Sequence, residues 1–304
     1  MVEFNFLLNT KPIVFDTFSN GEIRINVDSV ENAAENYTGD AWVVEWKYQN
    51  NDDFFKLALL KDTLDELLQL QQPIISLCIY YMPYSRMDRK MSLLSMSLKT
   101  ATNLINSLNF NSVYLLDAHS DVTPALLNNS SDMLSRIDYV DKNNTYSLNT
   151  LLNDYHAKVF KEENFDEHVD TILYPDFGAQ KRATTTYKNE LVAMKKRNLD
   201  TGKIIHFELF GEIPTEGRIF IIDDLCSYGN TFVNIAKALI EKGFPKEQLV
   251  LVVTHAENGI LLGDIADYFP TVHITDSFFQ EEWLLQPDAK MTKENLKITN
   301  YFKK

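Results

Sequence analysis

Two adjacent acids follow an apolar run in the segment RIFIIDDLCSYGNTF, which spans Arg218–Phe232. Asp223 and Asp224 come directly after the run, a turn containing Gly229 follows, and Thr231 opens an expected helix. Adjacent carboxylates can accept hydrogen bonds from two vicinal hydroxyls of a sugar. Free N–H groups of a turn and a helix N-terminus can bind a phosphate. A strand followed by an acidic helix cap gives the same pattern, so this segment alone leaves a sugar-phosphate site and a structural role equally open.

Basic residues gather at Arg86–Lys90 and Lys181–Arg197, although the chain as a whole is acidic. The 304 residues include 29 Lys and Arg against 43 Asp and Glu, which gives a formal net charge of −14. This balance argues against a broad surface for DNA or RNA, on which many phosphates must be neutralised. The two basic clusters favour a small anionic ligand instead, especially one that arrives with a divalent metal ion.

The composition is that of a globular protein, with 45% hydrophobic and 24% charged residues. No apolar run reaches the ~18–20 residues of a membrane span, and the N-terminal MVEFNFLLNT lacks the basic start and long apolar core of a signal peptide. Cys78 and Cys226 lie far apart in apolar contexts, so they predict neither a disulfide framework nor a zinc site. We therefore expect a cytoplasmic protein with no membrane or nucleic-acid partner.

Short apolar runs alternate with longer amphipathic stretches along most of the chain. The expected strands are Ile13–Phe15, Ile23–Val27, Ala41–Trp46, Ile74–Tyr81, Ser112–Leu116, Thr171–Tyr174, Leu191–Met194, Ile204–Glu208, Arg218–Ile222, Gln248–Thr254 and Val272–Thr275. The expected helices are Phe54–Leu70, Leu93–Leu108, Ala179–Lys188 and Thr231–Lys242. Gly243 is well placed to end the last of them. This alternation predicts an α/β fold with mainly parallel sheets flanked by helices, in which ligands bind at the carboxyl ends of the strands.

A polar segment separates the pattern into two halves. The stretch Asn128–Asn153 is rich in Asn, Asp and Ser, which is typical of a boundary region. A chain of 304 residues is long enough for two domains of ordinary size. We expect these domains at residues 1–148 and 149–304.

The segment IIDDLCSYGNT resembles the PRPP-binding motif of type I phosphoribosyltransferases and ribose-phosphate pyrophosphokinases, also called PRPP synthetases. The usual motif is an apolar run, Asp-Asp, two residues, and then Asp-Thr-Gly-Gly-Thr. Gly229 and Thr231 keep this pattern, whereas Ser227, Tyr228 and Asn230 depart from it. The resemblance implies two phosphoribosyltransferase-like domains. It implies a ribose-phosphate site formed by Asp223, Asp224, Ser227, Tyr228, Gly229, Asn230 and Thr231.

Three segments of the first half resemble PRPP synthetases in particular. FSNGEIRINV, which begins at Phe18, is similar to the family's F-S-D-G-E segment, which contacts the adenine of ATP from a neighbouring subunit. YYMPYSRMDRK, which begins at Tyr80, is similar to Y-x-x-Y-x-R-Q-D-R-K, with Met87 in place of Gln. LLDAHSDVTPAL, which begins at Leu115, is similar to the segment that starts D-L-H. The ATP-binding residues that this resemblance implies are Phe18, Asn20, Glu22, Arg86, Met87, Arg89 and His119.

Two segments of the second half resemble other parts of the same site. YPDFGAQKRATTTY, which begins at Tyr174, resembles S-P-D-x-G-G-x-K-R-A. The resemblance implies a divalent-metal role for Asp176, and it implies one for His119 as well. LVAMKKRNLDTGKI resembles the family's flexible catalytic loop, in which Lys-x-Arg follows a short apolar strand, so Lys195 and Arg197 are the expected catalytic residues. A turn, a basic loop or a solvated helix face would explain each segment by itself, but five matches in order favour the resemblance.

The resemblance implies an enzyme that transfers a diphosphoryl group from ATP, with Mg²⁺, to the anomeric hydroxyl of ribose 5-phosphate or a 5-substituted ribose phosphate, and releases AMP. It also implies a homo-oligomer, from dimer to hexamer, because subunits share the ATP site. Three alternatives stay open. Ser227 and Tyr228 suit a larger acceptor, such as ADP-ribose in NAD-related metabolism. Met87 and Ser227 also suit a non-catalytic regulatory subunit, and the ribose-phosphate motif alone suits a PRPP-consuming phosphoribosyltransferase.

Overall fold

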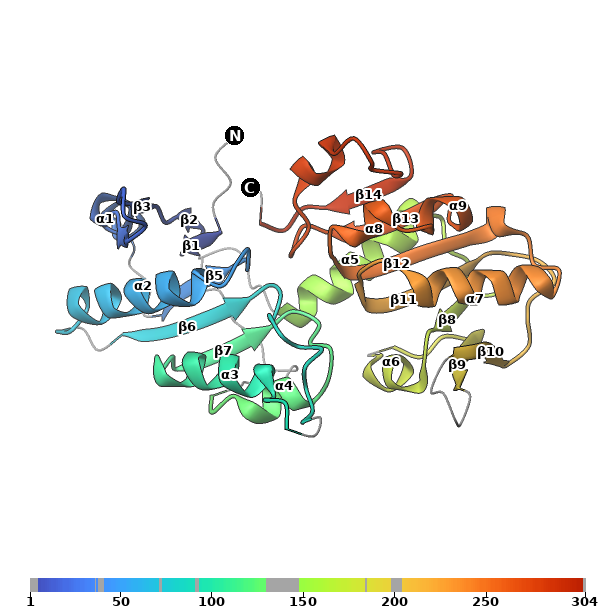
Figure 1. Ribbon diagram of the computed structural model, residues 1–304, viewed down its shortest axis with the longest axis horizontal. Helices are drawn as coiled ribbons and strands as arrows, with labels where there is room; N and C mark the ends of the chain where they lie inside the picture. The colour runs from blue at the N-terminus through green and yellow to red at the C-terminus, as the bar shows by residue number, and fades with distance from the viewer. Residues whose placement is uncertain are drawn as a thin grey trace. The chain divides into compact units, whose positions relative to one another are not determined.

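The computed structural model describes residues 5–35, 37, 41–70, 73–90, 93–129, 148–183, 185–197 and 204–302. The chain divides into two compact units, Met1–Asn153 and Asp154–Lys304 (Figure 1). The division falls within the helix α5 (Leu148–Glu162), which occupies the end of the stretch expected as a boundary. None of the helices in the described ranges has the length and apolar character needed to cross a membrane.

The first unit is built on a five-stranded sheet in the order β2-β1-β5-β6-β7. β5, β6 and β7 are parallel, whereas β1 runs antiparallel to β5. The strands of this sheet and of a separate hairpin are β1 (Phe6–Leu8), β2 (Lys11–Pro12), β3 (Phe15–Thr17), β4 (Ile23–Ile25), β5 (Ala41–Trp46), β6 (Ile74–Ile79) and β7 (Ser112–Leu115). The helices are α1 (Val27–Ala34), α2 (Asp53–Leu67), α3 (Ser97–Ser107) and α4 (Val122–Leu126).

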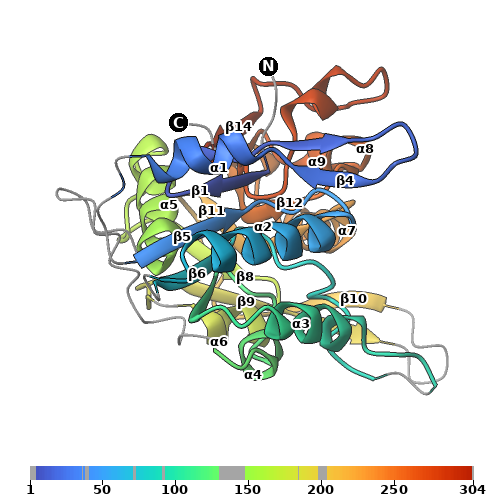
Figure 2. The ribbon, with the colours of Figure 1, turned by 90° about the vertical axis from the view of Figure 1, so that its left-hand side faces the viewer.

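The core of the first unit lies between its sheet and the amphipathic helices. α2 buries Leu57, Leu60 and Leu64, a spacing that places all three on one face of the helix. The sequence pattern does not predict β1 or α1. α1 begins where a strand was expected to end, because Asn26 caps it by accepting a hydrogen bond from the Ser29 N–H. The β3–β4 hairpin projects away from the five-stranded sheet (Figure 2).

The second unit is built on a seven-stranded sheet in the order β10-β9-β8-β11-β12-β13-β14. Every neighbouring pair is parallel except β9 and β10. The strands are β8 (Thr171–Tyr174), β9 (Glu190–Arg197), β10 (Ile204–Phe210), β11 (Ile219–Cys226), β12 (Leu249–Ala256), β13 (Thr271–Thr275) and β14 (Leu296–Thr299). The helices after α5 are α6 (Phe177–Arg182), α7 (Asn230–Glu241), α8 (Gly259–Leu262) and α9 (Ile265–Tyr268), with 3₁₀ turns at Lys246–Gln248 and Glu281–Leu285. The two sheets confirm the expected α/β fold.

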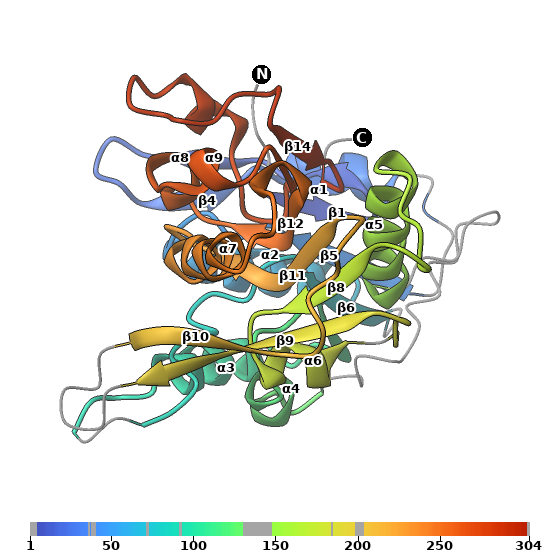
Figure 3. The same cartoon turned by 90° about the vertical axis from the view of Figure 1, so that its right-hand side faces the viewer.

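The centre of the seven-stranded sheet is covered on both faces. Every residue of β12 is buried, as is typical of a parallel strand between two helical layers. α7 lies on one face of β11 and β12, and α5 lies on the other (Figures 1 and 3). On the α5 side, the hydroxyl of Tyr155 donates to the Val253 carbonyl at 2.9 Å. α7 ends at Glu241, and Gly243, the predicted stop, follows two residues later with a φ of +91°, which suits a residue without a side chain.

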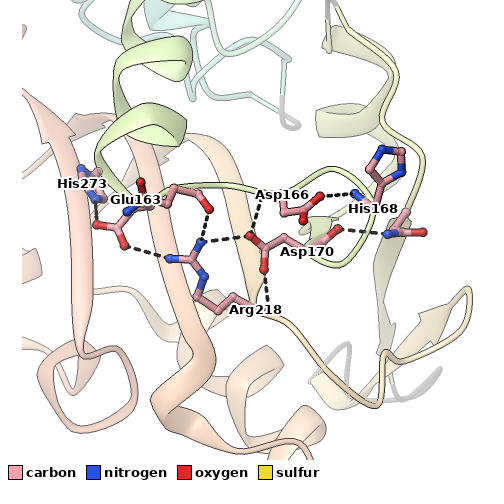
Figure 4. Close-up of polar contacts among 8 residues, drawn as sticks. Glu163, Asp166, His168, Asp170, Arg218 and His273 are labelled. Carbon is pink, nitrogen blue, oxygen red and sulfur yellow. Dashed lines mark hydrogen bonds and ion pairs between the residues drawn. The ribbon is translucent and has the colours of Figure 1, made fainter.

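An ionic network fastens the amino ends of two neighbouring strands to the end of α5 (Figure 4). Arg218 precedes β11, and its guanidinium lies 3.0 Å from Asp170, which precedes β8, and 3.2 Å from Glu163, which follows α5. Asp170 also accepts the backbone N–H of Arg218 at 2.8 Å. His273 of β13 is buried, and its Nε2 lies 2.9 Å from Glu163 Oε1. The network therefore stabilises the amino-terminal edge of the sheet, opposite to the carboxyl ends of the strands.

His273 makes the stability of this unit depend on pH. Burial lowers the pKa of His273, and the neighbouring Glu163 carboxylate offsets this only in part, so the fold favours the neutral imidazole. In the unfolded chain the same group binds a proton at about pH 6.5. The stability that neutral His273 contributes is therefore present above about pH 6.5 and is lost as the pH falls below that value.

We expect the free energy of unfolding, measured in urea at about pH 7.5 and 5.5, to fall more steeply in the natural protein than in His273→Gln. Gln keeps an N–H donor for Glu163 and does not titrate. Equal pH dependence in the two proteins would contradict the role assigned to His273.

Candidate active site

The acid pair lies within a strand rather than beyond its end. The expected strand stops at Ile222, but β11 continues to Cys226 and keeps its register with β12 from Ile219↔Leu249 to Cys226↔Ala256. Asp223 and Asp224 therefore sit on hydrogen-bonded backbone near the carboxyl end of a central strand. A strand in this position holds its side chains more firmly than a loop does.

Arg182, the last residue of α6, binds both acids. Its Nη2 lies 2.7 Å from Asp224 Oδ1 and 3.4 Å from Asp223 Oδ1. Asp223 Oδ1 also accepts the backbone N–H of Asp224 at 3.0 Å. All three side chains are largely shielded from water, with exposed fractions of 19% for Arg182, 18% for Asp223 and 4% for Asp224. Charged groups in such a setting interact more strongly than they do on an open surface.

The sequence does not single out Arg182 as a site residue, because a basic side chain on a helix is usually solvated. The helix expected at Ala179–Lys188 is in fact only Phe177–Arg182 and ends at Ala183, whose backbone is extended. Three consecutive Thr residues follow, and β-branched side chains disfavour a continued helix. Arg182 thus lies at the helix end, next to β11. Its position in the segment that resembles S-P-D-x-G-G-x-K-R-A is the one feature of the sequence that could have pointed to a role in the site.

The surroundings of the acid pair shift the pKa of Asp223. Burial raises the pKa of Asp223 well above its usual range, the adjacent Asp224 carboxylate raises it further, and Arg182 acts in the opposite direction. The shorter ion pair of Arg182 is with Asp224. Both acids keep carboxyl oxygens that can accept hydrogen bonds from hydroxyl groups.

The loop after β11 has a conformation fixed by its neighbours. Gly229 precedes α7 with a φ of +76°, and a Cβ atom there would lie 2.3 Å from the Cδ1 of Ile265 in α9. Gly259 and Gly263 flank α8, and a Cβ atom at Gly263 would lie 2.1 Å from the Tyr228 carbonyl oxygen. α8 and α9 therefore support the loop from behind, a role that the sequence pattern does not reveal.

The same loop leads into the N-terminus of α7, where backbone N–H groups can bind a phosphate. α7 has twelve residues, and its first hydrogen bond to the loop runs from the Val233 N–H to the Gly229 carbonyl. The N–H groups of Asn230 and Thr231 precede that bond and have no acceptor within the helix. The Tyr228 side chain is 55% exposed, so an aromatic surface flanks these donors.

Asp176 caps α6 at the carboxyl end of β8. Its Oδ1 accepts the Ala179 N–H at 2.8 Å, and the side chain as a whole is exposed. Among the described residues, no group of three His, Cys, Asp or Glu side chains could enclose a metal ion. Mg²⁺ needs only one or two carboxylates when substrate phosphates supply the other ligands. The donors present thus fit a magnesium ion that enters with a nucleotide, not an ion enclosed by protein ligands.

Lys195 and Arg197 lie in a strand, which corrects the expectation of a loop. β9 pairs with β8 only from Glu190 to Val192, and beyond that point it continues beside β10 alone, with Lys195 opposite Phe207 (Figure 3). Lys195 is half-buried on the same face of this ribbon as the buried Phe207, whereas Met194 on the opposite face is exposed. Within the described part of the chain, no contact joins the Lys195 side chain to the acid pair.

The predicted ATP-binding residues lie in the first unit, in two places. Phe18, Asn20 and Glu22 form the turn of the β3–β4 hairpin, where the Asn20 side chain accepts the Glu22 N–H at 3.1 Å. Phe18 is 50% exposed, with the Arg24 guanidinium 5.1 Å from its ring centre. This arrangement confirms the expected turn and leaves an aromatic face open at its tip.

The other ATP-binding candidates follow neighbouring parallel strands. Arg86, Met87 and Arg89 come after β6, and His119 comes after β7. Because β6 and β7 are parallel neighbours, the segments that hold these residues leave the same edge of the sheet. Met87 and Arg89 are exposed, and His119 is half-buried. The helix expected at Leu93–Leu108 starts only at Ser97.

Comparisons with known proteins agree with this arrangement. No protein-family model matches the chain. It is 24% identical over 289 residues to a ribose-phosphate pyrophosphokinase of Hyphomonas neptunium, which covers 93% of this chain and 82% of that protein. It is 27% identical to the enzyme of the same name from Maricaulis maris, over 82% of this chain and 72% of the relative.

A solved structure gives the same result for the fold. Phosphoribosylpyrophosphate synthetase from Mycobacterium smegmatis matches with a TM-score of 0.59 and 14% identity, over 96% of this chain and 87% of that one. The expected α/β fold is confirmed by this likeness, and the resemblance to ribose-phosphate pyrophosphokinases is confirmed by the named relatives.

Proposed function

We propose that this relative of the ribose-phosphate pyrophosphokinases transfers a diphosphoryl group from ATP to the anomeric hydroxyl of ribose 5-phosphate and releases AMP. The observation that carries the proposal is the continuous path from the acid pair on β11 to the N-terminus of α7. The acid pair can accept hydrogen bonds from the hydroxyl groups of a ribose phosphate, and the helix N-terminus can donate N–H hydrogen bonds to its phosphate.

In the reaction, the anomeric oxygen forms a bond to the β-phosphorus of ATP, and the bond from that phosphorus to the α,β-bridging oxygen breaks. The hydroxyl proton passes to solvent and AMP leaves. The protein contributes mainly position and charge. Asp223 and Asp224 accept hydrogen bonds from the ribose hydroxyls, while the loop from Ser227 to Thr231 binds the 5-phosphate.

Cationic side chains balance the charge that develops on the transferred group. We assign this to Lys195 and Arg197, with Arg86 and Arg89 binding the polyphosphate of ATP. Phe18, Asn20, Glu22 and Met87 would contact the base of the nucleotide. We assign a part in magnesium binding to His119 in the first unit and another to Asp176 in the second, and magnesium would neutralise phosphate oxygens.

A larger acceptor is the second candidate, and one observation favours it. The Tyr228 ring is 55% exposed beside the donors of α7, where it can stack on a group beyond the 5-phosphate. Ser227 also takes the place of an acid in the family motif, which lowers repulsion of a second phosphate. ADP-ribose has both features, a diphosphate and a base.

The acceptor is tested by measuring AMP release from ATP with ribose 5-phosphate and with ADP-ribose side by side. We expect AMP with at least one of them, in amounts equal to the diphosphorylated sugar. A clear preference for ribose 5-phosphate, unchanged in Tyr228→Ala, would exclude the larger acceptor. Nucleotide binding without AMP from any acceptor would instead indicate a regulatory subunit, and pyrophosphate release with a nucleobase and no ATP a phosphoribosyltransferase.

We further propose a homo-oligomer in the cytoplasm. The support is the exposed Phe18 at the hairpin tip, in the segment that resembles one used by neighbouring subunits for adenine binding. Light scattering of the purified chain, with Phe18→Ala as the variant, measures the assembly and its effect on the KM for ATP.

A further inference from the structure

The two carboxylates of the acid pair meet at one nitrogen atom, which an extended strand does not by itself produce. Side chains of consecutive residues in a strand point to opposite faces of the sheet. Asp223 and Asp224 are consecutive in β11, yet each places its Oδ1 within 3.4 Å of Arg182 Nη2. Asp223 achieves this by folding back so that its Oδ1 also accepts the Asp224 N–H.

The helix α6 positions Arg182 Nη2 beside the two acids. Asp176 fixes the first turn by accepting the Ala179 N–H at 2.8 Å, and Ala179 is buried against the sheet. Gly178 leaves room for this cap, because a Cβ atom there would lie only 3.0 Å from Asp176 Oδ1, whereas its distance of 3.6 Å from Arg182 Nη1 would be an ordinary contact. The short helix thus holds Arg182 at its last residue, directed to β11.

We propose that Arg182 is a positioning residue that gathers the carboxylates of Asp223 and Asp224 into one hydroxyl-binding unit for the sugar acceptor. The inference rests on the proposed function, since it concerns the acceptor part of that site. Arg182 binds the Oδ1 atom of each acid, so the two acids meet the vicinal hydroxyls of the acceptor as one arranged group. Without the guanidinium, the two carboxylates repel each other and the strand directs them apart.

The expected consequence is a selective loss of acceptor binding. In Arg182→Gln, we expect the KM for ribose 5-phosphate to rise about tenfold or more, because a charge-assisted bond to each acid is lost. The KM for ATP stays within about twofold of its natural value, since the predicted ATP-binding residues belong to the first unit of the chain and Arg182 belongs to the second. Arg182→Lys keeps one cationic nitrogen and restores most of the acceptor affinity.

Lys242→Gln is the matched control. It removes the same charge from an exposed position at the C-terminal end of α7, whereas the loop that follows the acid pair lies at the N-terminal end. We expect this variant to match the natural protein in both KM values. Equal behaviour of Arg182→Gln and Lys242→Gln, or a rise in both KM values together, would overturn the proposal.

A binding measurement separates this proposal from the proposed function. Calorimetric titration of ribose 5-phosphate into the natural protein and the three variants needs no turnover. Weaker binding in Arg182→Gln with rescue by Lys supports the positioning role even if AMP is not formed, and then only the proposed reaction fails. Unchanged binding refutes the positioning role. If Arg182→Gln does not fold, Arg182→Lys decides. Positioning predicts that Lys restores most but not all of the acceptor affinity, because it lacks the planar guanidinium, whereas a role in folding alone predicts that a folded Lys variant binds ribose 5-phosphate as tightly as the natural protein.

Discussion

We expect Lys195→Ala to lower kcat for the proposed AMP formation about 10²–10³-fold, the usual effect of removing one preorganised donor from a developing charge. The reason lies in the β9–β10 ribbon. Lys195 is partly buried opposite Phe207, so its backbone is held in register rather than free. An ammonium group on a paired strand loses less freedom when it binds the transferred phosphoryl group than one on an unpaired segment.

The neighbouring residue provides a matched control. Lys196 carries the same charge, but its side chain points to the opposite face of the ribbon, where it is 55% exposed and lies 3.6 Å from Glu208. We expect Lys196→Ala to retain kcat within about twofold, because an exposed ion pair contributes little. Single-turnover AMP release and thermal unfolding would be measured on both variants. Similar losses in the two, or none in Lys195→Ala, would remove Lys195 from the reaction.

Gly229→Ala is expected to lower the free energy of unfolding by about 2–5 kcal/mol. Part of this is the left-handed backbone, which costs an L-residue about 1–2 kcal/mol. The rest comes from contact of the new methyl group with Ile265, whose Cδ1 and Cγ1 would lie 2.3 and 2.4 Å from it, since overpacking costs about 1–3 kcal/mol. Relief of this contact would shift the loop and weaken acceptor binding as well.

Gly243 separates the two contributions. It lies at the other end of α7 with a similar φ of +91°, but a Cβ atom there meets nothing within 4 Å. Gly243→Ala should therefore cost only about 1–2 kcal/mol in urea unfolding. In a double-mutant cycle, Ile265→Ala should reduce the cost of Gly229→Ala. Equal costs at Gly229 and Gly243, with no coupling to Ile265, would contradict the steric argument.

Sequence patterns predict the central strands well because their burial is visible in composition. Ala41–Trp46 and Thr171–Tyr174 have the expected bounds, and the order of elements gives the α/β fold. The patterns fail where charged or polar residues enter regular structure. β11 continues through Asp223 and Asp224, and β9 continues through Lys195, because pairing with a neighbouring strand outweighs local composition.

The candidate site was predicted only in part for a similar reason. The acid pair and Gly229 have a recognisable spacing, since they lie together in the chain. Arg182 lies 41 residues before Asp223, and its role depends on where a short helix ends. Ile265 supports Gly229 through a contact that no sequence pattern records. Partners that meet only in space need the fold before they can be named.

The ionic network around Arg218 has a consequence for how this protein can diverge. It stabilises the sheet from its amino edge, through Asp170, Glu163 and His273, at a distance from every residue proposed to meet the acceptor. The network and the proposed acceptor site therefore lie at opposite edges of the same strands. We expect exchanges at Ser227, Tyr228 or Asn230, whether in a natural lineage or in an engineered loop, to leave the contribution of this network to stability unchanged.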